Sequence, residues 1–127
     1  MLNGASMLRK LSKMKNYKRI AGLKKRQYQH TPVQVLNEIA DSLSEGADKY
    51  GTYNWRFERL HYSDYYSSTL RHLLAWYDGE DIDQESGLSH ITKAIAGLVV
   101  LRDAMLNDSV VDDRNLQTTK LDTSLCK

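Results

Sequence analysis

Four carboxylates crowd into six residues in the middle of the chain. They are Glu80, Asp81, Asp83 and Glu85. Like charges this close repel one another unless a cation compensates them. His72 precedes this acidic segment and His90 follows it, and each histidine suits a packed or capping position as well as it suits a reactive one. The spacing predicts Glu80, Asp83 and His90 as a catalytic group.

A second acidic group follows helical spacing. Its members are Glu38, Asp41, Glu45 and Asp48. At about 100° per residue these side chains form one stripe along a helix. A solvated outer face and a site for a hard divalent cation both explain such a stripe, since acids normally stay exposed and oxygen ligands suit Mg²⁺ or Mn²⁺. The metal-site interpretation predicts Glu38, Asp41, Glu80 and Asp83 as ligands to Mg²⁺ or Mn²⁺.

Basic and aromatic side chains near these acids could bind a nucleotide. The predicted substrate-binding residues are Lys49, Tyr50, Asn54, Trp55, Arg71 and His72. Lysine and arginine hold phosphates, an aromatic face stacks on a base, and asparagine can read a base edge. Each residue alone is more often structural, and Trp55 and Tyr50 would also fit a core. The sequence has no glycine-rich phosphate loop, which excludes the enzymes that depend on one.

Helices must position these residues. Thr31 and Pro32 suit an N-cap and a first helical position, and Gly51 supplies a stop. The apolar seam between them is Val33, Leu36, Ala40, Leu43, Ala47 and Tyr50. Spacings of three and four residues along this seam predict an amphipathic helix.

Two further helices are expected. The first begins near Ser63, ends at Gly79 and has a predicted inner face of Tyr66, Leu70, Leu73 and Tyr77. The second starts after caps within 86–89 and runs to about Leu106. Its small residues, Ala94, Ala96 and Gly97, would let another helix approach closely.

The predicted fold is all-α, a compact bundle of three main helices with an N-terminal helical arm. The expected parts are an arm at 1–30, a helical domain at 31–107 and a flexible polar tail at 108–127. Apolar positions recur at steps of three from Leu8 to Leu23, which favours a helical arm. Three helices with one conspicuous seam suggest completion by oligomerisation. The single cysteine, Cys126, has no partner and receives no role.

Charge is distributed unevenly. Residues 1–31 hold nine bases and no acid, whereas the remaining 96 residues hold nine bases and sixteen acids. The basic arm, residues 9–26, could bind nucleic acid through its phosphates or dock on an acidic protein body. No apolar run is long enough to span a bilayer and no signal peptide is visible, so no membrane partner and a cytoplasmic location are expected.

The ordered motifs of residues 32–106 resemble a known family. They are Gly46-Ala47-Asp48-Lys49-Tyr50-Gly51, Asn54-Trp55, Arg71-His72, Gly79-Glu80, Asp83, Glu85-Ser86-Gly87 and His90. This set resembles the N-terminal-domain family of phage dATP/dGTP diphosphohydrolases. That family is thought similar to the all-α nucleoside triphosphate pyrophosphohydrolases of the MazG type, whose helices offer carboxylate pairs to Mg²⁺.

The resemblance implies hydrolysis of a (deoxy)purine nucleoside triphosphate to the monophosphate and pyrophosphate, in the cytoplasm of an infected bacterial host. It implies that metal-bound carboxylates neutralise phosphate charge and activate a water. Glu38-x-x-Asp41 and Glu80-x-x-Asp83 match the pyrophosphohydrolase motifs only loosely. The alternative is a non-catalytic phage protein that binds and sequesters a signalling nucleotide, which needs the basic and aromatic residues but no metal.

Overall fold

The computed structural model describes residues 3–116, apart from the side chains of Leu8 and of residues 10–15. Cys126 and the second part of the predicted tail, 117–127, lie outside the described residues. The chain divides into two separate units, Met1–Pro32 and Val33–Lys127. Within the described part, no helix is both long enough and apolar enough to cross a bilayer.

The first unit contains helix α1, Gly4–Leu23, followed by a short 3₁₀ turn at Tyr28–His30. Asn3 caps α1, because its side-chain oxygen accepts a hydrogen bond from the Ser6 backbone N–H at 2.9 Å. The described part of the predicted apolar stripe, Tyr17 to Leu23, is exposed. The side chains of Leu8, Leu11 and Met14 lie outside the described part of the chain. The predicted helical arm is therefore a helix.

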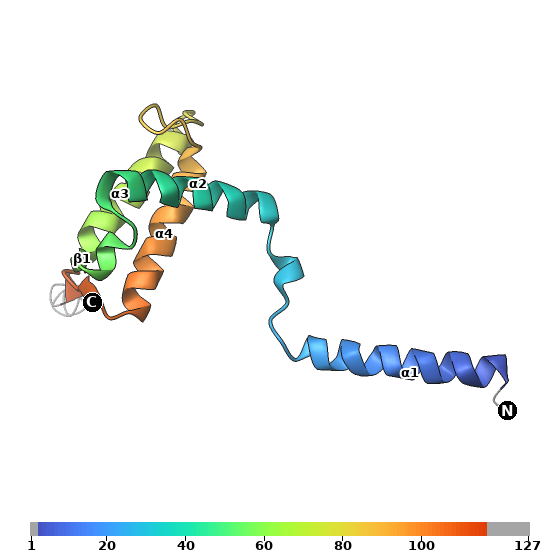
Figure 1. Ribbon diagram of the computed structural model, residues 1–127. Helices are drawn as coiled ribbons and strands as arrows, with labels where there is room; N and C mark the ends of the chain where they lie inside the picture. The colour runs from blue at the N-terminus through green and yellow to red at the C-terminus, as the bar shows by residue number, and fades with distance from the viewer. Residues whose placement is uncertain (1–2, 117–127) are drawn as a thin grey trace, which may run out of the picture. The chain divides into compact units, whose positions relative to one another are not determined.

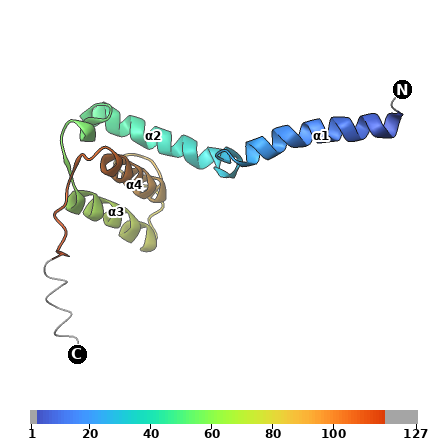
Figure 2. The same ribbon diagram turned by 90° about the horizontal axis from the view of Figure 1, so that it is seen from below.

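The second unit is built on three helices, α2 (Val33–Tyr50), α3 (Tyr62–Tyr77) and α4 (His90–Leu106). Helices α3 and α4 lie side by side and run in opposite directions, and α4 also contacts α2 (Figure 1 and Figure 2). The predicted all-α bundle is confirmed. The prediction that a second subunit completes it stays a prediction.

Small residues on α4 bring the helices close together. Ala94, Ala96 and Ala104 are buried, and a Cβ atom built on Gly97 would lie 3.1 Å from Thr69 Oγ1 on α3. The expectation of close approach along α4 is confirmed. Leu60, Val100 and Ala104 form the most buried apolar cluster among the described residues, and side chains from α2 and α3 pack around it.

Two predicted helix faces are wrong. Tyr66 and Tyr77 of the expected inner face of α3 are 68% and 84% exposed, and Leu70 and Leu73 are also exposed. The inward positions of α3 are instead Tyr65, Thr69 and His72, because this face borders a polar cavity. An assignment based on apolar residues alone therefore selects the opposite stripe.

The seam predicted on α2 is wrong over part of its length. Val33, Leu36 and Tyr50 are exposed, whereas Ser42 is buried beside the half-buried Leu43. From Ser42 onward the reason is the same as on α3, since the inward face of α2 also carries polar residues that border the cavity.

The segment after α4 is part of the fold, which corrects the prediction of a flexible tail from residue 108. Strand β2 (Val110–Val111) pairs in parallel with β1 (Leu60–His61). Ser109 is buried, and its hydroxyl donates to the Trp55 backbone oxygen at 2.6 Å. These pairings hold the polar segment to the bundle despite its weak periodicity.

Helix α3 begins at Tyr62, one residue before the predicted start near Ser63. Ser63 lies inside the helix rather than at its cap. Its backbone N–H donates to Asp113 Oδ1 at 2.9 Å, and its hydroxyl donates to Asp113 Oδ2. A carboxylate fifty residues away therefore accepts a hydrogen bond from a backbone N–H in the first turn of α3.

Candidate functional site

The connection between α3 and α4 is held by its own backbone. Gly79 (φ +103°) follows α3, and the N–H groups of Gly79 and Glu80 donate back to Trp76 and Ala75 at 3.0 Å. This is a glycine-dependent helix stop, as the sequence predicts. The Asp83 N–H donates to the Leu88 oxygen at 2.8 Å. The backbone of the acidic segment is therefore fixed.

Helix α4 begins where the prediction placed it. The hydroxyl of Ser89 accepts hydrogen bonds from the Ile91 and Thr92 N–H groups, at 3.1 and 3.4 Å. His90, the first residue of α4, is only 4% exposed. The cap and the fixed loop together hold the His90 side chain opposite α3.

A cluster forms where α3, the loop and α4 meet. Its members are His72, Asp83 and His90, and their potential ligand atoms all lie within 4.8 Å of one another. The two Nδ1 atoms, from His72 and His90, are 2.9 Å apart. Asp83 completes the cluster from the loop, while Ser86 fixes its Oδ2 atom through a hydroxyl at 2.6 Å and a backbone N–H at 3.1 Å.

The protonation states of the cluster follow from its surroundings. Burial lowers the pKa of His72 below its ordinary value of 6.5, and the nearby Lys93 and Arg71 act in the same direction. Burial alone would raise the pKa of Asp83, but the hydrogen bonds from Ser86 and the nearby histidines bring it below 3.8. At neutral pH the His72 imidazole is therefore neutral and the Asp83 carboxylate is charged.

Glu80 lies behind the cluster. Its Oε1 atom is 3.2 Å from His90 Nε2, the ring nitrogen that faces away from His72. The alignment is too poor for a hydrogen bond, and this buried Nε2 has no other partner among the described residues. The Glu80 side chain is half exposed, whereas the His90 side chain is buried.

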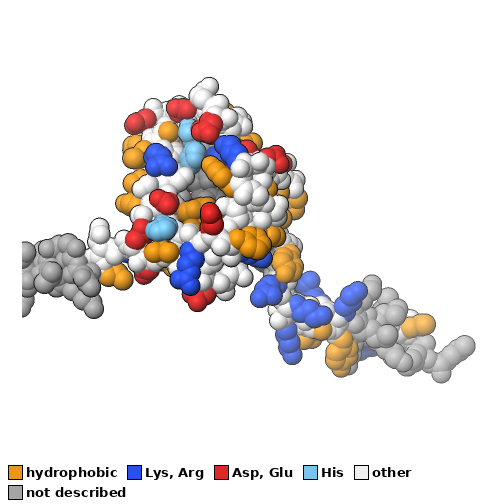
Figure 3. Space-filling view, turned by 60° about the vertical axis from the view of Figure 1, so that its left-hand side comes forward, with side chains coloured by type: hydrophobic (Ala, Val, Ile, Leu, Met, Phe, Trp, Pro, Cys, Tyr) orange, Lys and Arg blue, Asp and Glu red, His pale blue; other side chains and the backbone are white. Residues whose placement is uncertain are grey.

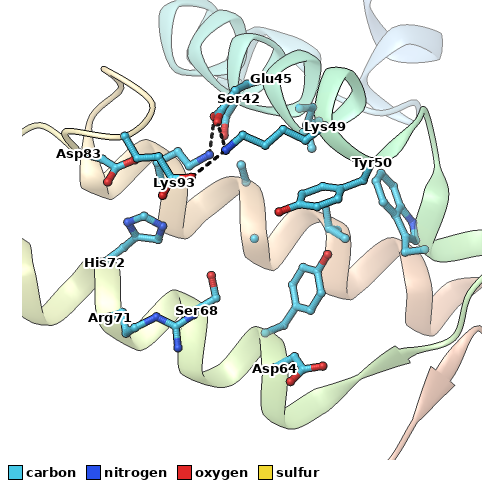
Figure 4. A pocket seen from close by; sticks show the side chains of 18 of the residues that line it. Ser42, Glu45, Lys49, Tyr50, Asp64, Ser68, Arg71, His72, Asp83 and Lys93 are labelled. Carbon is cyan, nitrogen blue, oxygen red and sulfur yellow. Dashed lines mark hydrogen bonds and ion pairs between the residues drawn. The ribbon is translucent and has the colours of Figure 1, made fainter.

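The cluster opens into a cavity of about 680 Å³ between α2, α3 and α4. Figure 3 shows a hollow on this face with basic, acidic and histidine side chains around it. In Figure 4, Asp83 and His72 lie toward one end of the cavity and Tyr50 lies toward the other. The cavity therefore has a histidine–carboxylate end and an aromatic end.

Two lysines enter the cavity from different helices and meet on one carboxylate (Figure 4). Lys93 Nζ is 2.6 Å from Glu45 Oε2, and Lys49 Nζ is 2.8 Å from Glu45 Oε1. Lys49 also reaches Glu85 at 3.2 Å. These hydrogen bonds lower the pKa of Glu45 and raise the pKa of Lys49. Lys49 is therefore fully charged at neutral pH.

Arg71 adds a third cation to the cavity wall. No carboxylate of the described residues forms an ion pair with Arg71, although carboxylates compensate both lysines. An exposed guanidinium beside a cavity can bind an anion bidentately without first breaking an internal pair.

The aromatic end combines a supported residue with freer ones. Trp55 donates its indole N–H to Asp103 Oδ2 at 2.8 Å, so this ring is held in place. Asn54 makes no side-chain hydrogen bond among the described residues, and Tyr50 is largely exposed. Tyr65 is half buried across the cavity, where burial raises the pKa of its hydroxyl.

The structure brings most of the predicted site residues around this one cavity. Those in its lining are Lys49, Tyr50, Asn54, Trp55, Arg71, His72, Asp83 and His90. Glu80 contacts the cluster from behind. Glu38 and Asp41 are exposed residues of α2 that do not line the cavity, and Glu38 accepts a hydrogen bond from Thr92 of α4 at 3.3 Å. They are not part of the His72, Asp83 and His90 cluster.

Sequence reasoning did not select Lys93, and it placed Glu45 only within the acidic stripe. Both line the cavity and pair with each other. A signal for Lys93 existed, because it lies three residues after His90 on the same helix and so shares its face. Glu45 also had a local signal, because the predicted site residue Lys49 follows it at i+4 and pairs with it. Its pairing with Lys93, forty-eight residues away, had none.

The fold and the cavity define a small all-α domain with a histidine–carboxylate cluster and three cations in one polar cavity. The chain belongs to the family described as dATP/dGTP diphosphohydrolase, N-terminal, whose model matches residues 15–114. A protein of Salmonella phage PMBT28 named dATP/dGTP diphosphohydrolase is 35% identical over 84 residues, which cover 64% of this chain and 27% of the relative. The match therefore spans about a quarter of the relative's length. No solved structure matches this chain.

Proposed function

We propose that this chain binds a (deoxy)purine nucleoside triphosphate in the cavity and hydrolyses it, with a divalent metal ion, to the monophosphate and pyrophosphate. The observation that carries the proposal is the meeting of the His72, Asp83 and His90 cluster with three cations in one cavity. The name of the phage relative supports the reaction type and the purine preference.

The charge of the cavity supports a metal requirement. Its lining holds three cations and four carboxylates, which are Lys49, Arg71, Lys93, Glu45, Asp64, Asp83 and Glu85. With neutral histidines the lining has a formal charge of −1, which disfavours a triphosphate. A divalent cation brings the lining to +1 and makes it attractive to a polyanion.

The two ends of the cavity would bind different parts of the nucleotide. Lys49, Lys93 and Arg71 would hold the phosphates and stabilise the charge that develops on them. Tyr50, Trp55 and Asn54, at the other end, would hold the nucleoside. A cavity of about 680 Å³ is within the usual range for small-molecule sites.

Asp83 and His90, with His72, would hold the metal ion, since two imidazoles and a carboxylate converge there. A divalent ion bound at this place supplies charge neutralisation and a water of lowered pKa. In the reaction, a water oxygen bonds to the α-phosphorus, the bond to the bridging oxygen breaks, and pyrophosphate leaves. The water's proton passes to solvent through the carboxylates at the histidine–carboxylate end of the cavity. Glu80 contributes by positioning His90.

Pyrophosphate release from dATP, dGTP, dCTP and dTTP with Mg²⁺ or Mn²⁺ tests the proposal. We expect release from the purine nucleotides and its loss in Asp83→Asn. Asp41→Asn is the matched control, because it makes the same chemical change outside the cavity, and it should retain activity. Folded protein that releases no pyrophosphate from any of them, or an Asp83→Asn variant as active as wild type, would contradict the proposal.

Nucleotide binding without hydrolysis is a second candidate. The partial match favours it, because the relative named for the activity contains much more chain than this domain covers. A binding protein would retain nucleotide, release no pyrophosphate and be largely indifferent to Asp83→Asn. Equilibrium binding of a non-hydrolysable nucleotide analogue to both proteins separates the two candidates.

A further inference from the structure

We infer that His72, Asp83 and His90 form a site for a divalent transition-metal ion of the Mn²⁺, Fe²⁺, Co²⁺ or Zn²⁺ class, in preference to Mg²⁺, with Glu80 orienting His90. The role of the ion rests on the proposed function. The site itself can be tested by metal binding, without turnover.

The donor atoms decide the class of metal. Two of the three candidate ligands are imidazole nitrogens and only one is a carboxylate. Imidazole suits first-row transition metals, and two histidines with one carboxylate are a recurrent set for ferrous ions. Mg²⁺ prefers oxygen ligands and retains its waters, so the two imidazoles would contribute little to its binding affinity.

The separation of the imidazoles fits one ion. Two donors about 2.1 Å from a metal ion and at right angles to each other lie about 3.0 Å apart. The Nδ1 atoms of His72 and His90 are 2.9 Å apart. The same distance also allows a hydrogen bond between the rings, so the Asp83 carboxylate within 4.8 Å is the feature that points to a cation.

Each of two ligands has a supporting group. Ser86 donates twice to Asp83 Oδ2 and leaves Oδ1 without a donor among the described residues. Glu80 approaches His90 Nε2 at 3.2 Å, so Nδ1 is the nitrogen presented to His72. A carboxylate behind a ligating histidine fixes the ring and increases its basicity.

The site has room for substrate. All three ligands also line the cavity, so positions that they do not fill face Lys93 and Arg71. An ion with three protein ligands keeps open positions for water or phosphate oxygens, as catalytic metal sites do.

Metal binding to the full chain tests this inference. Co²⁺ added to metal-free protein should bind one ion per chain and give visible absorption bands that report nitrogen ligation. Calorimetry should show Mn²⁺ and Zn²⁺ binding at least about 100-fold more tightly than Mg²⁺.

Variants locate the ion. His72→Asn and Asp83→Asn should each weaken Co²⁺ binding by about 100-fold or more, and Glu80→Gln by about 10-fold to 100-fold. His30→Asn, an exposed histidine of the first unit, should change nothing. Circular dichroism establishes that each variant is folded, and Asp83→Asn, a substitution in a loop, gives a second test if His72→Asn is not.

The outcomes separate this inference from the proposed function. Metal binding that depends on His72 and Asp83, without pyrophosphate release, supports the site and contradicts the hydrolase. Hydrolysis with Mg²⁺, together with Co²⁺ binding that is unchanged in folded His72→Asn and Asp83→Asn, overturns the site and leaves the hydrolase standing. Mg²⁺ binding as tight as Mn²⁺ binding overturns the assignment of the metal class.

Discussion

At each end of helix α4 a carboxylate lies against nitrogen-containing side chains, with different results. Near its C-terminal end, Asp103 accepts hydrogen bonds from the Trp55 indole at 2.8 Å and from two nitrogens of the Arg56 guanidinium at 2.9 Å. At its N-terminal end, Asp83 and two histidines face one another, and no lysine or arginine forms an ion pair with Asp83 among the described residues.

The difference separates a structural contact from a ligand site. The Asp103 group is complete within the protein, and it ties the 3₁₀ turn at Asn54–Arg56 to α4. The Asp83 group contains converging acceptors and no cation, so it gains most from an ion supplied by solution. We therefore expect substitutions at the first group to change stability and those around the second to change binding and turnover.

The largest expected effect is on turnover. Lys93→Met removes a charge that reaches the cavity from α4, and kcat/KM for dGTP should fall by about 10²-fold to 10³-fold because the developing phosphate charge loses a donor. Steady-state kinetics of pyrophosphate release measures the change. Arg102→Met, on the same helix but outside the cavity lining, is the control and should remain within about twofold of wild type. Equal losses in the two variants would contradict the assignment of Lys93.

The next effect is on stability. Asp103→Asn should lower the melting temperature by roughly 5–10 °C, because it breaks a bidentate ion pair and the support of Trp55. Metal affinity should not change. Thermal unfolding followed by circular dichroism measures the shift. An Asp103→Asn protein that melts like wild type would contradict the structural role of the Asp103 group.

The same contact gives a pH dependence. The hydrogen bonds from Arg56 and Trp55 lower the pKa of Asp103 below 3.8, so its stabilisation is fully present above that value and is lost as pH falls through the native pKa. The difference in melting temperature between wild type and Asp103→Asn should be constant from about pH 5 to pH 7 and should narrow below about pH 4. A difference that widens on acidification would have the wrong sign.

Gly46 tests whether the cavity is kept open at a cost in stability. A Cβ atom at Gly46 meets no atom within 4 Å, and this helical residue lines the cavity. Gly46→Ala should stabilise the metal-free protein by about 1 kcal/mol while weakening nucleotide binding. Gly97→Ala, at a second helical glycine of the cavity lining, serves as a comparison for stability alone, since its Cβ would meet Thr69 Oγ1 at 3.1 Å and should lose much of the helix-propensity gain. Denaturant unfolding measures both, and a Gly46→Ala variant with tighter nucleotide binding would contradict the prediction.

The smallest expected effect concerns Thr69 of α3, which lies beside Gly97, in the middle of α4. Its hydroxyl is buried without a hydrogen-bond partner among the described residues. Thr69→Val keeps the shape and removes the unpaired group, so it should stabilise the fold by roughly 0.5–1 kcal/mol. Denaturant unfolding checks this value. Destabilisation would indicate that the hydroxyl has a partner that the protein acquires in solution.

Local signals in the sequence predicted the helices well. Gly51 and Gly79 follow their helices with positive φ angles, and Ser89 caps α4. Each signal acts within a few residues, so it can be found without knowledge of the fold. Long-range contacts could not be found in this way, which is why the cap that Asp113 provides to Ser63 and the pairing of β1 with β2 were not predicted.

The prediction of which helix faces are buried failed for a different reason. The prediction assumed that apolar side chains point inward, but α3 directs Ser68 and His72 toward the cavity and leaves Leu70 and Leu73 exposed. The residue types of the site were recognisable because Lys49, Arg71, His72 and Asp83 have distinctive chemistry. Their position beside Lys93 and Glu45 depends on how α2, α3 and α4 pack together, and this packing could not be predicted from local sequence patterns.

The most direct test of the account is anomalous diffraction from crystals grown with Mn²⁺ and a non-hydrolysable dGTP analogue. We predict a manganese peak bounded by His72, Asp83 and His90, with the phosphates of the analogue toward Lys93 and Arg71. A peak beside Glu38 and Asp41, or a nucleotide bound outside the cavity with no metal at the histidines, would contradict it.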